Sequence, residues 1–252
     1  MGRYTGFIAF GLMLAAAAVY SFLPGDPPGD RPASTASSPG SSTQPKADPA
    51  QSPTRPASDI PQGRGFDFYV LALSWSPTFC DSEAAGRNRE QCGGDKDFSW
   101  VVHGLWPQND KGWPENCPTS EGTRVPERIG RTVMDIMPSM GLIGHQWRKH
   151  GSCSGLSMSD YFKLIRQAHD SIRIPAELSD VDRESRTSPQ AVEAAFIRSN
   201  QGLARSAVAV TCDRERVDEV RICLDKSLGF RNCPEVDSRS CRRSEITIPP
   251  VR

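Results

Sequence analysis

The chain has 252 residues, and its 30 Lys and Arg balance 30 Asp and Glu, so the formal net charge is zero. This balance excludes an overall cationic nucleic-acid coat protein and an acidic tail protein, because any polyanion must be held by a local arrangement of charge. The length allows one good-sized domain or two small ones. A chain of this length can bury a hydrophobic core without the help of disulfides. Its eight cysteines therefore indicate that the protein is in an oxidising compartment, where disulfides form.

The N-terminal segment, residues 1–23, has the pattern of an export signal. Arg3 supplies a positive charge, and an apolar run with an alanine tract extends from Gly6 to Leu23. The segment is either a signal peptide or an N-terminal anchor, and the alanine tract favours cleavage. We therefore expect a secreted or periplasmic protein, which is held at a membrane only if the segment is not cleaved.

A segment of low hydrophobicity follows the N-terminal run. Residues 24–65 are rich in Pro, Ser, Thr, Ala and Gly, and Ile60 is the only large aliphatic residue among them. Because so little apolar surface cannot offset the entropy of ordering, we predict a disordered linker. The folded domain is then expected to span residues 66–252.

Two apolar, aromatic-rich runs open the domain. Residues 66–75 indicate a buried strand, and residues 98–103 indicate a second strand that ends at Gly104. His103 would then end a strand, where a side chain can face a cleft from a rigid backbone.

Helical patterns occupy the middle of the domain. Pro126 is at a favourable first-turn position for a helix over 127–137, and Ser159 can cap a helix over 160–172 that has one apolar face. A third helix is predicted over 189–197.

Two more strands are predicted near the end of the chain. They occupy residues 205–212 and 216–224 and are joined by a short charged turn. Strands, then helices, then strands indicate an α+β fold with a mainly antiparallel central sheet flanked by helices.

Three of the four histidines fall in two compact motifs. The first is HGLWP at 103–107, and the second begins at His145 and reads HQWRKHGSC. If the second motif is helical, His145 and Lys149 lie one turn apart, as do Gln146 and His150. Two imidazoles and an ammonium group cannot be buried without an anionic partner. The cluster is therefore either a solvated basic helix or a site for an anion such as phosphate.

Together the two motifs resemble the active-site segments of the ribonuclease T2 family, in their order and in their flanking cysteines. The first strand with Pro77 and Cys80 behind it, and the ICLD segment that begins at Ile222, also resemble this family. The resemblance implies an α+β endoribonuclease that cleaves RNA with little base specificity and uses no cofactor or metal.

The resemblance also implies roles for single residues. His103 and His150 match the acid–base pair, His145 matches the phosphate-binding histidine, and Lys149 matches the cation that stabilises the pentacoordinate phosphorus. Gln146 is a departure, because the family usually places Glu there. An amide keeps hydrogen-bonding capacity but cannot take a proton, so we count Gln146 among the site residues with an altered role.

Two tryptophans are candidates for substrate binding. Trp106 and Trp113 can stack on a base, and the alternative for each is a place in the cleft wall or the core. Gln108 is a second departure from the family, because many members carry an acidic residue there that helps to hold a base. The base preference therefore stays open.

The chemistry of RNA suits two imidazoles. The 2′-hydroxyl is the nucleophile, one imidazole would remove its proton, and the other would protonate the departing 5′-oxygen, leaving a 2′,3′-cyclic phosphate. We favour His150 as the base and His103 as the acid, although the motifs alone allow either order. We expect a monomer that acts on single-stranded RNA and releases the product after cleavage, without a stable nucleic-acid complex.

The eight cysteines can form four disulfides. One pair lies close in sequence and can close a small loop. For the other cysteines the resemblance implies one bridge between the motifs and two nested bridges, although the last four cysteines allow three pairings. The resulting pairs are Cys80–Cys92, Cys117–Cys153, Cys212–Cys241 and Cys223–Cys233.

Two other functions compete with this interpretation. The histidines and Cys153 could in principle hold zinc, but Cys153 has a better use in a disulfide, and His145 and His150 do not share a helix face. A non-catalytic binding module is favoured by Gln146 alone, while both imidazoles and Lys149 are retained.

Overall fold

The structure of the protein is a computed structural model, which describes residues 59–93 and 97–251. The predicted N-terminal leader, residues 1–23, lies outside the described residues, as does most of the predicted linker. Within the two described ranges, no helix is long and apolar enough to cross a membrane.

The last residues of the predicted linker, 59–65, contact the domain. The Arg64 N–H donates to the Ser154 carbonyl over 3.0 Å, and Ile60 packs against the main core. Residues 59–65 are therefore packed against the domain, since Ile60 supplies apolar surface that is buried there.

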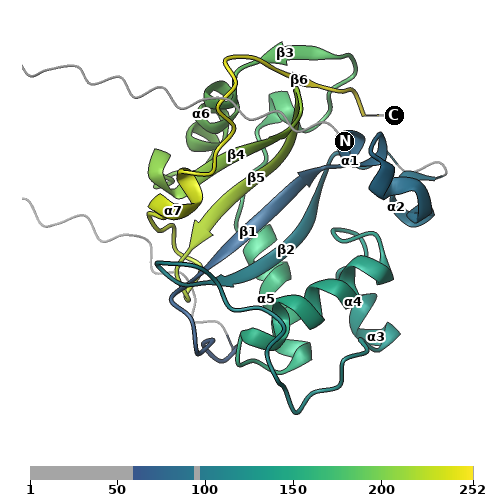
Figure 1. Ribbon diagram of the computed structural model, residues 1–252, viewed down its shortest axis with the longest axis vertical. Helices are drawn as coiled ribbons and strands as arrows, with labels where there is room; N and C mark the ends of the chain where they lie inside the picture. Colours follow the sequence, from purple (N-terminus) through teal and green to yellow (C-terminus); the bar gives the residue numbers. More distant parts are fainter. Residues whose placement is uncertain (1–58, 94–96, 252) are drawn as a thin grey trace, which may run out of the picture. The chain divides into compact units, whose positions relative to one another are not determined.

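A sheet lies at the centre of the domain (Figure 1), and the described residues contribute six strands to it. Its order is β2–β1–β5–β6–β3, and β4 pairs with β5 outside this path. The β5–β6 pair is parallel and the other pairs are antiparallel, which confirms a mainly antiparallel sheet. The strands are β1 Phe68–Trp75, β2 Trp100–Gln108, β3 Ser185–Thr187, β4 Val208–Asp213, β5 Arg216–Leu224 and β6 Ile246–Ile248.

Strand β1 separates two hydrophobic clusters, because all eight of its residues are buried and successive side chains point to opposite faces. Leu71 and Leu73 lie in the main core, whereas Phe68 and Val70 lie in a second, smaller cluster with Val236. The second cluster defines the face of the sheet opposite the main core, and the name "second face" is used for it below.

Helices cover the main core. The helices α4 and α5 contact β2, and α6 contacts β4 (Figure 1). The helix α5 buries one apolar stripe, as its sequence pattern predicts. The helices are α1 Ser76–Cys80, α2 Arg89–Cys92, α3 Glu127–Gly130, α4 Met140–Lys149, α5 Met158–Asp170, α6 Pro189–Ser199 and α7 Pro234–Asp237. Single 3₁₀ turns occupy Glu83–Arg87, Gly151–Cys153, Ala176–Leu178 and Arg205–Ala207.

The second predicted strand is longer than expected. The prediction that it ends at His103 is wrong, because β2 continues through the HGLWP motif to Gln108. Pro107 is tolerated because β2 is an edge strand of the sheet, where a missing N–H donor costs little.

Two helix predictions also need correction. The helix predicted over 127–137 stops at Gly130, because the N–H groups of Val133 and Ile136 bond to carbonyls three residues back and the chain continues as tight turns. The cap of α5 is Ser157 rather than Ser159, since the Ser157 hydroxyl accepts from the Asp160 N–H over 3.1 Å.

A 3₁₀ turn replaces the start of the strand predicted over 205–212, so β4 begins at Val208. The strand predicted over 216–224 has the predicted bounds. The third helix, α6, begins after Ser188, whose hydroxyl accepts from the Ala191 N–H.

All four expected disulfides are present. The bridge between the two motifs ties the loop after β2 to the turn after α4. The bridges are Cys80–Cys92, Cys117–Cys153, Cys212–Cys241 and Cys223–Cys233. Each of them constrains the unfolded chain and typically contributes about 2–4 kcal/mol to stability.

Candidate active site

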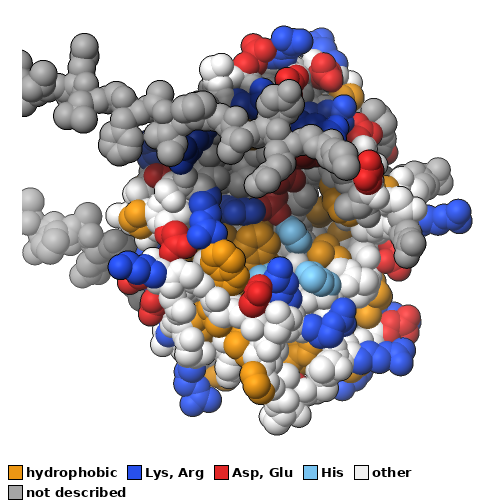
Figure 2. All heavy atoms as spheres, viewed as in Figure 1, with side chains coloured by type: hydrophobic (Ala, Val, Ile, Leu, Met, Phe, Trp, Pro, Cys, Tyr) orange, Lys and Arg blue, Asp and Glu red, His pale blue; other side chains and the backbone are white. Residues whose placement is uncertain are grey.

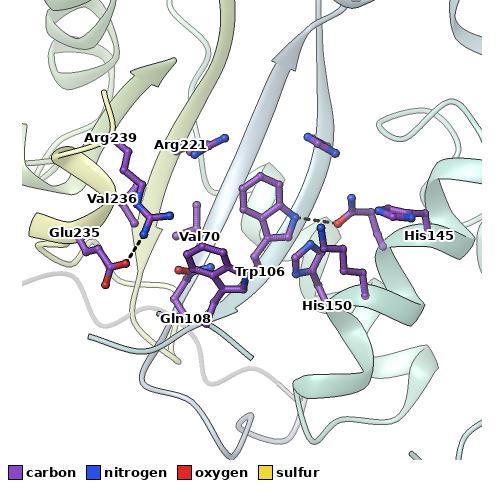
Figure 3. Close-up of a pocket in the computed structure, with 13 residues that line it drawn as sticks. Val70, Trp106, Gln108, His145, His150, Arg221, Glu235, Val236 and Arg239 are labelled. Atoms are coloured by element: carbon purple, nitrogen blue, oxygen red, sulfur yellow. Dashed lines mark hydrogen bonds and ion pairs between the residues drawn. The ribbon is translucent and has the colours of Figure 1, made fainter. Parts of the chain in front are cut away.

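A cavity of about 310 Å³ lies on the second face of the sheet. Strands β1, β2 and β5 contribute Val70, Trp106 and Arg221 to it. In the close-up, α4 lies on one side of Trp106 and α7 on the other (Figure 3). The other residues around the cavity are His103, Gln108, Trp113, His145, Gln146, Lys149, His150, Glu235, Val236 and Arg239.

The surface around this region is mixed in character. In Figure 2, histidine side chains lie beside hydrophobic ones near the middle of the visible face, with Lys and Arg side chains next to them. The zero net charge of the chain thus conceals a local group of cations, which is the arrangement that a polyanion requires.

A β-bulge directs His103 into the cavity. Ala72 of β1 pairs with Gly104 of β2, but Leu73 pairs with Val102, so His103 is an extra residue between the two pairs. In a regular strand the side chains of His103 and Gly104 would point to opposite faces of the sheet. Because of the bulge, Val102 lies in the main core and His103 lines the cavity.

The second motif lies at the end of α4. The helix contains His145 and Lys149 one turn apart, as predicted, and His150 is its C-cap. The Asn116 N–H donates to the Lys149 carbonyl over 2.8 Å, and the disulfide of Cys153 lies just beyond. These contacts hold the basic end of the helix against the loop that follows β2.

One indole joins the two motifs. The Trp106 ring lies 5.2 Å from the His103 ring and 5.3 Å from the His150 ring, measured between centroids. The structure therefore brings together two histidines that lie 47 positions apart in the sequence. The side chain of Gln146 accepts a hydrogen bond from the Trp106 Nε1–H over 2.9 Å, which fixes the indole between them.

Gly104 makes this packing possible. A Cβ atom at Gly104 would lie 2.1 Å from the Gln146 Oε1 and 2.4 Å from the Trp106 Nε1. Only a glycine at this position allows the two side chains to come so close to the backbone of β2.

His150 lies in a cationic and buried setting. Its residue is 7% exposed, and in the described part of the chain nothing hydrogen-bonds to its Nδ1. Burial, followed by the nearby Lys149, His103 and His145, lowers the pKa of His150 to about 3. The pKa of His145 is also lowered, first by burial and then by Lys149 and His103. His150 is therefore neutral at neutral pH and can accept a proton.

His103 has the opposite partner. Its Nδ1 lies in a short contact with the Glu219 carboxylate, and the same carboxylate also accepts from Arg221. Sequence reasoning missed both residues of β5. One signal was available, because Glu219 and Arg221 alternate with the buried Val220 and Ile222 and so share the face opposite the core.

Lys149 also has an anionic neighbour. Its Nζ lies 3.7 Å from a carboxylate oxygen of Glu115, and both side chains are partly exposed. Such a pair contributes little to stability, so the ammonium group remains available to an anion in the cavity.

The two tryptophans differ in free surface. The Trp106 ring is surrounded by the two imidazoles and by the Arg221 guanidinium, which lies 5.3 Å from its centroid. Trp113 is 43% exposed, and the Arg239 guanidinium lies 4.7 Å from its ring. Glu235 holds this wall by accepting from Arg239 over 2.6 Å and from the Gly112 N–H over 2.8 Å.

The donor set does not suit zinc. Cys153 is bonded to Cys117 and has no thiolate to offer. Among the described residues, no group of three or more His, Cys, Asp or Glu side chains could hold a metal ion.

The fold and the site define a disulfide-bonded α+β protein with three histidines and a lysine around one cleft. Residues 66–233 match the ribonuclease T2 family, and the chain belongs to this family.

Sequence relatives include bacterial proteins. A ribonuclease of Aeromonas hydrophila is 40% identical over 114 residues, which cover 45% of this chain and 50% of that protein. A probable ribonuclease of Haemophilus influenzae is 30% identical over 183 residues, which cover 66% of this chain and 61% of that protein. The chain thus matches only part of the length of these two relatives.

Solved structures share the fold. An RNase-related protein from Calystegia sepium has a TM-score of 0.61 at 22% identity and covers 75% of this chain and 100% of its own. RNase NT in complex with 5′-AMP has a TM-score of 0.57 at 24% identity, over 74% of this chain and 100% of its own.

Proposed function

We propose that the protein is an endoribonuclease that cleaves single-stranded RNA by transphosphorylation and leaves 2′,3′-cyclic phosphate ends. The observation that carries this proposal is the pair of imidazoles, His103 and His150, on one indole in one cavity. Each of the two proton transfers that RNA cleavage needs is worth on the order of 10²–10⁴-fold in rate.

His150 acts as the general base. It takes the proton of the 2′-hydroxyl, and the freed oxygen forms a bond to phosphorus. His103 acts as the general acid and protonates the 5′-oxygen as its bond to phosphorus breaks. The neutral state of His150 and the carboxylate beside His103 support this order of roles.

Lys149 and His145 offset the charge of the transition state, Lys149 through its ammonium group and His145 through an imidazole N–H. Lys149 and His145 lie one helical turn apart on α4 and both line the cavity. They would stabilise the non-bridging oxygens of the pentacoordinate phosphorus, which is electrostatic preorganisation. DNA lacks the 2′-hydroxyl and is not a substrate.

Gln146 positions the indole rather than moving a proton. Its amide oxygen bonds to Trp106, and an amide cannot titrate. The departure from Glu at this position is therefore compatible with catalysis by the two imidazoles.

Trp113 is the stacking surface for a base, and Trp106 belongs to the cleft wall. Only Trp113 leaves a large part of its ring open. Stacking tolerates every base and is worth about 1–3 kcal/mol, which supports a low base specificity. Trp113→Ala should raise KM for a short RNA by about 5- to 100-fold and leave kcat nearly unchanged, as measured by initial rates. A change confined to kcat would exclude the stacking role.

We also propose that the protein works outside the cytoplasm. Four disulfides suit an oxidising compartment. The apolar N-terminal run supplies an export signal. Fractionation of cells that express the full chain tests this location, and a cytoplasmic pool with reduced cysteines would contradict it.

The activity is tested on a defined RNA oligonucleotide and on a copy with a single 2′-deoxy position, each with and without EDTA. We expect fragments with cyclic phosphate ends, measured by mass spectrometry, no cleavage at the deoxy position, and no effect of EDTA. Binding of intact RNA at every pH would instead identify a non-catalytic RNA-binding protein. Loss of cleavage in EDTA would identify a metal enzyme.

A further inference from the structure

Glu219 is a buried carboxylate at the edge of the cavity. The residue is 4% exposed, and each of its side-chain oxygens has a partner. One oxygen contacts the His103 Nδ1, and the other accepts from the Arg221 Nε–H over 2.9 Å. Burial of a carboxylate costs desolvation free energy even when both of its oxygens are paired. Glu219 is therefore a candidate for a role beyond stability.

The side chains of Glu219 and His103 must reach across strand β1 to contact each other. Glu219 belongs to β5 and His103 to β2, and β1 lies between these two strands. The residues of β1 that pair with Glu219 and with Gly104 are Ser74 and Ala72. Their small side chains leave room on the second face, and adjacent strands are about 4.8 Å apart, so the two side chains must span about two strand spacings.

Glu219 is the anion in a cationic neighbourhood. His103 faces His145, Lys149 and His150 from α4, whereas β5 supplies the carboxylate. Burial raises the pKa of Glu219, but its bonds to His103 and Arg221 outweigh burial, and the pKa lies below its usual value. The carboxylate is therefore charged at neutral pH.

The remaining charged groups near His103 also lie on β5. Arg221 holds the second oxygen of Glu219 and lies over the Trp106 ring. Asp218 is nearby, with a pKa that burial and then Glu219 raise above its usual value. Its side chain accepts from the Thr211 hydroxyl over 3.1 Å, so it is turned to β4.

We infer that Glu219 is a positioning residue that holds His103 in the orientation of the general acid, with Arg221 fixing the carboxylate. This inference rests on the proposed ribonuclease function. With Nδ1 bonded to Glu219, the Nε2 of His103 is the nitrogen left to carry the proton toward the leaving oxygen.

The test uses two substrates that differ only in the leaving group. One is a dinucleotide, whose 5′-oxygen needs a proton to depart. The other is a nucleoside 3′-(4-nitrophenyl) phosphate, whose nitrophenolate departs without one. For Glu219→Gln we expect kcat on the dinucleotide to fall about 10²-fold, with KM little changed, and kcat on the nitrophenyl ester to fall less than about threefold.

The pH profile gives a second readout. Because Glu219→Gln removes a negative charge in contact with the His103 ring, the basic limb of the kcat profile should move to lower pH in this variant. Glu219→Asp keeps the charge but is one methylene too short to cross β1, and it should show the same dependence on the leaving group. This second variant tests the inference if Glu219→Gln does not fold.

Glu193 offers a matched control. It is also buried, at 2% exposure, and pairs with Arg205 over 3.4 Å, but it does not line the cavity. Glu193→Gln should lower the melting temperature without changing the ratio of the two rates or the pH profile.

The outcomes separate the inference from the function on which it rests. An equal loss on both substrates in the Glu219 variants, or no loss at all, would overturn the positioning role. If the wild-type protein cleaves neither substrate, the proposed function itself fails.

Discussion

His103 and His150 contact the same indole but occupy opposite electrostatic settings. His103 lies in a bulged strand with a buried carboxylate on its Nδ1, and its side chain is 38% exposed. His150 lies at the end of a helix, is 7% exposed, and has cations as its charged neighbours. The comparison shows how the surroundings alone can give two identical side chains different electrostatic properties, on which the proposed proton roles rest.

The fold also holds the backbones of the two histidines in different ways. The backbone of His103 is part of the central sheet, where β1 and β5 supply Ala72 and Glu219 around it. The backbone of His150 depends on the end of α4, which is held by a hydrogen bond to the loop after β2 and by the disulfide of Cys153. The proposed acid thus lies on a strand of the central sheet, and the proposed base lies at a helix end that is anchored by a disulfide.

Removing the imidazole ring of either histidine is expected to have the largest effect on the rate of RNA cleavage. His103→Ala and His150→Ala should each reduce cleavage of RNA by at least about 10³-fold, because each deletes one proton transfer. The measurement is the initial rate on a defined RNA, with folding checked by thermal melts. His169→Ala is the matched control, since His169 pairs with Asp170 and does not line the cavity. Near-wild-type activity in either variant would refute the assignment.

Lys149 is expected to matter less, because it acts on charge rather than on a proton. Lys149→Met should lower kcat by about 10²-fold through lost stabilisation of the phosphorus oxygens. It should also move the acidic limb of the pH profile to higher pH, because Lys149 is one of the groups that lower the pKa of His150. A loss of rate with no movement of that limb would show that Lys149 does not act on the base.

The burial of His150 should make the stability of the protein depend on pH. Its pKa is about 3 in the folded protein and about 6.5 when unfolded, so between these values only the unfolded state binds the proton. Stability should therefore fall as the pH is lowered from about 6.5 toward 3, by up to about 1.4 kcal/mol per pH unit from this group. Urea unfolding at several pH values should show a shallower fall in His150→Gln. Equal slopes in both proteins would contradict the buried, neutral state.

We expect the smallest effect on activity at Gln146, whose side chain bonds to the Trp106 indole that contacts both histidines. A carboxylate at this position can accept the same hydrogen bond, so Gln146→Glu should leave kcat unchanged or raise it. Steady-state rates at neutral pH test this expectation. A large loss would show that the amide has a role of its own, for which Gln146→Met serves as the comparison.

Local patterns predicted much of this molecule. The two motifs, the apolar strands and the capped helices all depend on residues close in sequence, and the structure contains them with shifts at their ends. The predicted length of the second strand was wrong because a β-bulge at His103 and an edge position for Pro107 leave no local signal. The helix that stops at Gly130 failed for a similar reason, since tertiary contacts select tight turns there.

The missed site residues depend on contacts between distant strands. Glu219 meets His103 only because β5 and β2 both pair with β1. The alternation in β5 could have placed Glu219 and Arg221 on one face, but not in front of a particular histidine. Arg239 similarly reaches Trp113 from the turn that follows α7, a four-residue helix with no amphipathic pattern of its own.

The most direct test of opposite proton roles compares His103→Ala and His150→Ala on the dinucleotide and on the nitrophenyl ester. If His103 is the acid, His103→Ala should recover most of its activity on the ester, while His150→Ala stays inactive on both substrates, because the 2′-hydroxyl must still lose its proton. Equal recovery in both variants, or recovery only in His150→Ala, would contradict the assignment.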